Sequence, residues 1–186
     1  MDYNRNVDKY DWDRTGVSFN QVLDVSNEAA VVTEPVSRAA FKLYAKIDSD
    51  DDDAVIDAII PAARRMCENY SGINFVARVV TATINNLNGG TYLPYGPIGT
   101  VTAVTDVDNN AFTTDGGYQL SGTLFKQLLY PTIDNVTVTY TGGYATCPVD
   151  LVNAVKAQAL FLYQNRGDSD LGLSPIAQMI LNPLKR

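Results

Sequence analysis

The chain has 186 residues, of which 14 are Lys or Arg, 21 are Asp or Glu and none is His, so its formal net charge is −7. This length suits one domain with a hydrophobic core, and a hydrophobic content of 46% excludes an intrinsically disordered protein. The negative charge disfavours broad binding to nucleic acid, and the lack of histidine excludes Ser-His-Asp triads, Cys-His pairs and histidine zinc sites.

Residues 1–31 are predicted to form an extended N-terminal arm. They are polar and acidic, show no sustained hydrophobic period and carry the spaced aromatic residues Tyr3, Tyr10, Trp12 and Phe19. Such a segment buries too little apolar surface to order alone, but its aromatic side chains can anchor it to a neighbouring subunit. Docking on a neighbour and plain disorder both stay open. Nothing in the sequence has the apolar length of a signal peptide or membrane span.

Ordered structure is predicted to begin with a helix over 33–47. Thr33 is a suitable N-cap, and Pro35 fits the first turn, where a missing N–H costs nothing. One apolar stripe at helical spacing is formed by Val36, Ala40, Leu43 and Ile47. The acidic run 48–53 then ends this helix and begins another, because carboxylates favour the positive end of a helix dipole.

The second predicted helix covers 52–71 and forms a hairpin with the first. It closes at Gly72, which allows a left-handed C-cap. Pro61 lies well past the first turn, where it removes a backbone hydrogen bond and predicts a kink.

Between residues 75 and 140 the hydrophobic period changes to two, and Val, Thr and Tyr become frequent, which predicts a small antiparallel β-domain. Strands are expected near 75–85, 98–107, 117–121, 124–129 and 134–140. The connection 86–99 is rich in Gly and Pro and is predicted to be a projecting loop without a strand.

Helices return after the β-domain. A long apolar helix is predicted over 148–166, and a short one begins at Ser174-Pro175, continues to about Leu181 and ends before Pro183. The predicted fold class is therefore α+β: a helix hairpin and C-terminal helices packed together, with an inserted small antiparallel β-domain.

The acidic run 48–53 begins like a calcium-binding EF-hand loop. Asp53 stands where that loop needs Gly, however, and Ile59 stands where it needs a bidentate Glu. Calcium binding is therefore the weaker alternative to a solvated helix start. The basic residues Arg38, Lys42, Lys46, Arg64 and Arg65 are interpreted as balancing its charge, and a modest positive face on the helix hairpin stays open as the alternative.

No other motif carries catalytic, metal or cofactor chemistry. The Gly pairs lack the Lys and the spacing of phosphate-binding loops and are interpreted as turns. Asp106 and Asp108 lie beside a turn and are expected to face solvent. Cys67 and Cys147 lack CxxC spacing and are interpreted as buried thiols. The sequence thus predicts no cofactor, no metal and no enzyme.

The order of several short motifs carries one further signal. They are Val32-Thr33-Glu34, Ala54-Val55-Ile56-Asp57-Ala58-Ile59-Ile60, Glu68-Asn69-Tyr70-Ser71-Gly72, Leu93-Pro94-Tyr95-Gly96-Pro97-Ile98, Tyr140-Thr141-Gly142-Gly143-Tyr144, Pro148-Val149-Asp150-Leu151 and Tyr163-Gln164-Asn165-Arg166. Together, over 32–186, they resemble the head-to-tail connector, or adaptor, family of tailed bacteriophages. The sequence departs from the family pattern at Pro61 and in its extended arm.

The resemblance implies a virion protein that is assembled in the host cytoplasm and located at the head-to-tail interface. Such a protein forms a ring, usually dodecameric, that joins the portal to a tail stopper or tail-tube protein. DNA passes through its lumen without specific binding, and no membrane is involved. Two alternatives stay open, namely another neck or tail-completion protein and a small intracellular ligand-binding domain.

The resemblance also assigns regions and residues. The connector domain corresponds to 32–167, and the portal-docking helix and tail correspond to 168–186. The implied portal interface consists of Ile176, Ile180, Leu181, Leu184, Lys185 and Arg186. The implied tail-side loop carries Asn88, Tyr92 and Tyr95.

Overall fold

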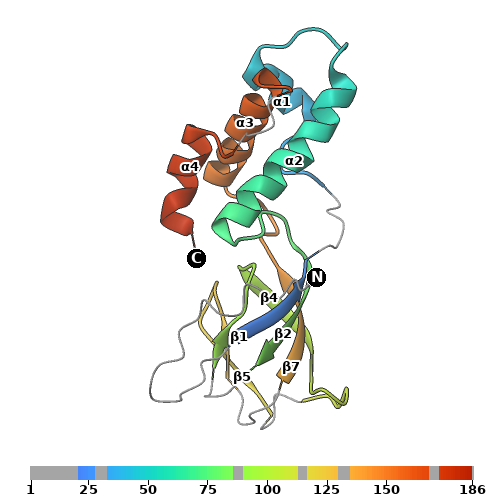
Figure 1. The fold of residues 1–186 in the computed structure, drawn as a ribbon, viewed down its shortest axis with the longest axis vertical. Helices are drawn as coiled ribbons and strands as arrows, with labels where there is room; N and C mark the ends of the chain where they lie inside the picture. The colour runs from blue at the N-terminus through green and yellow to red at the C-terminus, as the bar shows by residue number, and fades with distance from the viewer. Residues whose placement is uncertain are drawn as a thin grey trace, which may run out of the picture.

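The computed structural model describes residues 21–27, 33–85, 90–112, 117–129, 135–167 and 172–185. The chain forms two bodies stacked along its long axis, with the helices at one end and the strands at the other (Figure 1). The helices are α1 (Arg38–Ala45), α2 (Asp53–Ser71), α3 (Val149–Gln164) and α4 (Pro175–Leu181), followed by the 3-10 turn η1 (Asn182–Leu184). The predicted α+β fold class is confirmed.

The β body consists of two antiparallel sheets. The strands are β1 (Gln21–Ser26), β2 (Arg78–Asn85), β3 (Thr91–Tyr92), β4 (Ile98–Thr105), β5 (Gln119–Ser121), β6 (Gln127–Leu129) and β7 (Asn135–Gly142). One sheet has the order β1-β2-β7-β4 and the other the order β3-β6-β5. The inner face of the larger sheet alternates as expected, because Val80 pairs with Tyr140, Ala82 with Val138 and Ile84 with Val136, and all six are buried.

The helical body has a separate core. Its buried side chains come from every helix and include Phe41, Ile56, Ile60, Cys67, Val155, Ala177 and Leu181. Asp52, at the start of α2, joins the end of α3, where its carboxylate accepts a hydrogen bond from the Tyr163 hydroxyl and lies 3.1 Å from Nη1 of Arg166. These two contacts lower the pKa of Asp52 below its usual range. The Arg166 guanidinium also lies over the Tyr163 ring.

Strand β1 corrects the prediction that residues 1–31 form an arm. It pairs antiparallel with β2, so that Gln21 lies opposite Asn85 and Ser26 opposite Thr81. The prediction was wrong for this part of the segment because β1 is held through its backbone. Its described side chains are exposed or half-buried, and a bulge at Leu23 breaks the alternation that would have revealed a strand.

The first helix begins later than predicted. Ser37, not Thr33, is its N-cap, since the Ser37 hydroxyl accepts a hydrogen bond from the Ala40 N–H at 3.2 Å. The inward face is consequently set by Phe41, which is fully buried, and the predicted apolar stripe fails at Leu43, whose side chain is 83% exposed.

The second helix runs continuously from Asp53 to Ser71 and ends at Gly72 in the left-handed region, as predicted. Pro61 lies inside it and offers no N–H to the carbonyl oxygen of Asp57. The kink at this position stays a prediction.

The structure also corrects two smaller predictions, for the connection 86–99 and for Cys147. The connection 86–99 contains the short strand β3, which pairs with β6, so the prediction of a loop without a strand was wrong at Thr91–Tyr92. This pairing joins segments far apart in sequence, which a local pattern does not reveal. Cys67 is buried as predicted, but Cys147 is half-buried.

Candidate assembly surfaces

The short helix α4 is positioned by buried hydrogen bonds to α3. Ser174 caps it, accepting a hydrogen bond from the Ala177 N–H at 3.1 Å, and the Ser174 N–H donates to Oε1 of Gln158 at 2.6 Å. Gln158 is fully buried and also donates to the carbonyl of Gly172 at 3.2 Å. Gln158 of α3 therefore holds the segment before α4 at two points, Gly172 and Ser174. The predicted start of α4 at Ser174-Pro175 is confirmed.

The outer face of α4 is apolar. Ile176 is 54% exposed and Met179, one turn later, is 70% exposed. Ile180 and Leu184 are half-buried. Leu181 is fully buried in the helical core, so the structure removes it from the accessible part of the predicted portal interface.

Sequence reasoning missed Met179. The signal was present, because Met179 follows Ile176 by three residues and therefore shares its helix face. Leu181 entered the predicted interface as an apolar anchor that the family resemblance implies. Its spacing of four residues from the buried Ala177 identifies it as inward-facing.

The chain beyond α4 lies against the end of α2. The Tyr70 hydroxyl donates to Oδ1 of Asn182 at 2.5 Å, and Nε2 of Gln178 lies 3.4 Å from the same hydroxyl oxygen. Nζ of Lys185 lies 4.9 Å from the centre of the Tyr70 ring. Lys185 is exposed, whereas Arg186 lies outside the described residues.

The predicted tail-side residues divide into one outward and one inward side chain. Tyr92 is exposed on β3, whereas Tyr95 is half-buried and packs against the β core. The segment between them is anchored, because Leu93 is buried and the carbonyl of Pro94 accepts a hydrogen bond from Tyr140 at 2.6 Å. Asn88 lies outside the described residues, as do the arm residues Tyr3, Tyr10, Trp12 and Phe19.

A buried ionic network joins the two bodies. Glu68, near the end of α2, is only 1% exposed. Its carboxylate lies 2.6 Å from Nη1 of Arg64, also on α2, and 2.9 Å from Nη2 of Arg78 at the start of β2. The same carboxylate accepts a hydrogen bond from the Phe75 N–H at 2.8 Å. The network therefore spans the connection between the helices and the sheet.

Polar groups of three further segments complete this network. Glu34 lies 2.7 Å from Nε of Arg64, and Asn27, directly after β1, accepts a hydrogen bond from Nε of Arg78 at 2.8 Å. Asn74 accepts from Arg78 at 2.7 Å and exchanges hydrogen bonds with Asn27. The two arginines and two glutamates balance in charge, as burial requires. The residues are far apart in sequence, and only the Arg64–Glu68 spacing could have indicated the network.

The acidic run is occupied by ion pairs. Lys42 contacts the carboxylates of Asp50 and Asp53, which raise the pKa of its ammonium group, and Arg38 lies 3.1 Å from Asp53 and from Asp57. This agrees with the interpretation of charge balance. Within the described residues no group of three or more His, Cys, Asp or Glu is placed to hold a metal ion.

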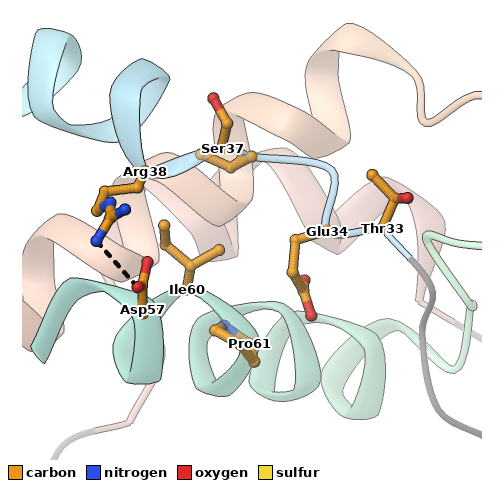
Figure 2. A pocket seen from close by; sticks show the side chains of 8 residues that line it. Thr33, Glu34, Ser37, Arg38, Asp57, Ile60 and Pro61 are labelled. Carbon is orange, nitrogen blue, oxygen red and sulfur yellow. Dashed lines mark hydrogen bonds and ion pairs between the residues drawn. The ribbon is translucent and has the colours of Figure 1, made fainter. Parts of the chain in front are cut away.

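A shallow groove of about 230 Å³ lies between the segment that leads into α1 and the middle of α2. Figure 2 shows Ser37 and Arg38 on one side and Ile60 and Pro61 on the other, with Arg38 bonded to Asp57 at one end. Val36, Ile60 and Pro61 give it apolar walls, and polar groups are added by Thr33, Glu34, Ser37, Arg38 and Asp57.

None of the described helices is long and apolar enough to cross a membrane. Both cysteines have unreactive environments, because burial raises the pKa of Cys67 to about 12 and that of Cys147 to about 11. Asp106 does not face Asp108 as a catalytic pair. Its carboxylate instead accepts hydrogen bonds from the backbone N–H groups of Asp108 and Asn110, at 2.9 and 2.8 Å, and closes a turn.

Comparison with known proteins gives one family match and a shared fold. The sequence profile of the family described as head completion protein matches residues 35–169. No curated protein matches the sequence.

Among solved structures, the chain is similar to one from the neck of an empty gene transfer agent particle, computed with C6 symmetry. The TM-score is 0.72 at 20% sequence identity, over 88% of this chain and 95% of that one. A chain from the neck of the native gene transfer agent particle, computed with C12 symmetry, gives a TM-score of 0.68 at 20% identity, over 88% and 95%. A chain from the virion of the native gene transfer agent particle gives 0.68 at 20% identity, over 87% and 94%.

Proposed function

The chain belongs to the head completion protein family, and from this premise we propose that it is a structural adaptor in the neck of a tailed phage or phage-like particle. The match of the family profile over residues 35–169 carries this proposal. The fold shared with chains of gene transfer agent necks supports it. The protein is located at the head-to-tail interface of the virion and acts by assembly, not by catalysis.

The working form is a closed ring of identical copies. The neck structures that share the fold were computed with sixfold and twelvefold symmetry, which supports a dodecameric ring. A ring requires two different, complementary faces on each subunit, because head-to-tail contacts are heterologous. The two-body shape in Figure 1 offers separate surfaces for neighbours and for partners above and below the ring.

The exposed face of α4 is the portal-docking surface. Ile176 and Met179 supply its apolar area, Ile180 and Leu184 border it, and Lys185 adds a charge at its end. An exposed apolar face flanked by a cation is typical of a protein interface. We therefore propose the portal-docking role for the segment 168–186, with Met179 in place of the buried Leu181.

The β body carries the tail-side contacts. Tyr92 is exposed there and combines apolar area with a polar tip, as contact residues often do. The partner is a stopper or tail-tube protein. Residues 1–20, with their four aromatic side chains, remain the arm that laps a neighbouring subunit, while 21–26 belong to the sheet of the β body.

DNA passes through the lumen of the ring without specific binding. The formal charge of −7 on each copy supports this part of the proposal, because a ring of such subunits repels the phosphate backbone and lets it slide. Reversing the charge of lumen residues is expected to slow DNA ejection, and unchanged ejection kinetics would contradict this role.

Negative-stain microscopy of the purified chain, together with mass measurement over a range of concentrations, tests the ring. Rings with a central hole and a mass of a fixed number of copies are the expected result. A chain that stays monomeric at every concentration and also fails to bind a portal ring would contradict the adaptor function. Portal binding by Met179→Asp, compared with Asn153→Asp on the exposed side of α3, tests the docking surface.

A further inference from the structure

Leu43 is the most exposed large apolar side chain among the described residues, at 83%. It follows the fully buried Phe41 by two residues, a rotation of about 200° around the helix, so it points away from the core. Ala39, one turn earlier on α1, and Lys46, at its C-cap, are also exposed. The outer side of α1 therefore presents an apolar knob next to a cation.

The groove between the segment leading into α1 and α2 has the complementary character. Val36 and Ile60 form its buried apolar floor, and Pro61 adds an apolar wall in the middle of α2. Leu43 does not fill the groove of its own chain, because its side chain is exposed. Leu43 is also absent from the residues that line the groove, so the two are separate surface features of one subunit.

The groove also offers oxygen acceptors to a cation. Asp57 lies at one end, with its side chain 56% exposed and its carboxylate 3.1 Å from Arg38. Arg38 shares its charge with Asp53, also at 3.1 Å, so Asp57 is not fully neutralised. The carbonyl oxygen of Asp57 lacks its usual helical donor, because Pro61 has no N–H. An ammonium group arriving with an apolar side chain would meet the exposed Asp57 carboxylate.

We propose that the outer side of α1 in one subunit docks in this groove of the next subunit, with the Leu43 side chain against Ile60 and Pro61 and the Lys46 ammonium group near Asp57. The inference rests on the proposed ring function and deepens it, because it names the two faces of the heterologous contact. The occupant is a second copy of this chain. A knob and a groove on different faces of one subunit generate a ring when the rotation closes, and a filament when it does not.

The expected loss of self-association follows from the apolar area that the Leu43 side chain would bury in the groove. Moving one leucine side chain from water into an apolar site strengthens a contact by roughly 10- to 140-fold in association constant. Leu43→Ser is therefore expected to weaken self-association of the full chain by such a factor at each contact, measured by sedimentation over a concentration series. Because Leu43 is exposed, the variant keeps the thermal unfolding midpoint of the parent chain. Val149→Ser is the matched control, since it removes another exposed apolar side chain, 72% exposed, that lies outside both proposed docking surfaces, and it leaves self-association unchanged.

Cysteine cross-linking tests the geometry of the contact. Thr33 lies at the rim of the groove and is exposed, so Thr33→Cys and Leu43→Cys place one thiol on each proposed face. Two populations, each with one substitution, are mixed and treated with a short bis-maleimide, and the double variant is treated in parallel. The mixture is expected to give cross-linked pairs that contain one of each, and the double variant a ladder of multimers. Asn153→Cys in place of Thr33→Cys, and the parent chain with its two native cysteines, set the background.

The possible results distinguish failure of the proposed α1–groove contact from failure of the proposed ring function. Rings that form without cross-linking above background, together with normal association of Leu43→Ser, overturn this contact and leave the ring in place. Cross-linked ladders from open filaments support the contact and count against the closed ring. The absence of both self-association and cross-linking overturns the contact and the self-assembled ring together.

Discussion

Replacing Glu68 by Gln is expected to loosen the junction between the helical and β bodies more than any surface change. The substitution keeps the size of the side chain but removes the charge that Arg64 and Arg78 share at 2.6 and 2.9 Å. Arg64 retains Glu34, whereas Arg78 is left with the amides of Asn27 and Asn74. Arg78 then becomes a buried cation without a carboxylate.

Removing one partner of a buried ion pair costs about 3–5 kcal/mol in the free energy of unfolding. Gln keeps the volume and one acceptor for the Phe75 N–H, so the lower part of that range, about 3 kcal/mol, is expected for Glu68→Gln. For a chain of this size each kcal/mol lowers the melting temperature by about 2–4 °C. The expected fall is therefore about 6–12 °C for Glu68→Gln.

Urea unfolding followed by circular dichroism measures the free-energy change, and amide hydrogen exchange of the β2 and β7 backbone provides a second probe of the β body. Asp57→Asn is the control, because it removes an exposed ion pair that contributes about 0–1 kcal/mol. A loss below about 1 kcal/mol in Glu68→Gln, equal to the control, would refute the idea that the buried charges hold the junction. Transitions of the two probes that separate in the variant would show that the network couples the two cores.

Three further results are expected. Because the pKa of Asp52 is lowered in the fold, its contacts stabilise the fold above the ordinary carboxyl pKa, and this stabilisation is lost as the pH falls through the lowered pKa. The urea midpoints of Asp52→Asn and the parent chain should therefore differ at pH 7 and converge in acid. Cys67 and Cys147 should resist a thiol reagent at pH 8 and both react in denaturant, as titration of released thiolate would report. Gly143→Ala should cost about 1–3 kcal/mol by urea unfolding, because φ is 118° there and a Cβ would lie 2.5 Å from the Val76 carbonyl oxygen; an unchanged midpoint would contradict this.

Local signals in the sequence predicted the elements whose ends are set by neighbouring residues. Ser174-Pro175 marked the start of α4 because a hydroxyl cap and a first-turn proline act within one turn. Gly72 marked the end of α2 for the same kind of reason. The predicted start of α1 was wrong because Thr33 and Ser37 both suit an N-cap, and the packing of Phe41 in the core decides between them.

The parts that sequence reasoning missed depend on contacts between distant segments. β1 is held by backbone hydrogen bonds to β2, and its sequence therefore shows no regular hydrophobic alternation that would predict a strand. Arg78 and Glu68 are an ordinary cation and anion in the sequence, and only the fold buries them together. For the predicted portal interface the sequence indicated α4, but which of Met179 and Leu181 is exposed there depends on how the helix is oriented on the core.

The order of the elements has a mechanical consequence. The chain crosses between the β body and the helical body three times, from β1 to α1, from α2 to β2 and from β7 to α3. A single connection would let the two bodies rotate against each other, but the short connections 72–77 and 143–148, together with the buried network of Arg64, Glu68 and Arg78, leave little freedom to twist. A torque or axial load applied to the helices is therefore transmitted to the strands instead of being lost at a joint. Under the proposed adaptor function, each subunit would pass load between its partners on either side of the ring with little deformation of its own.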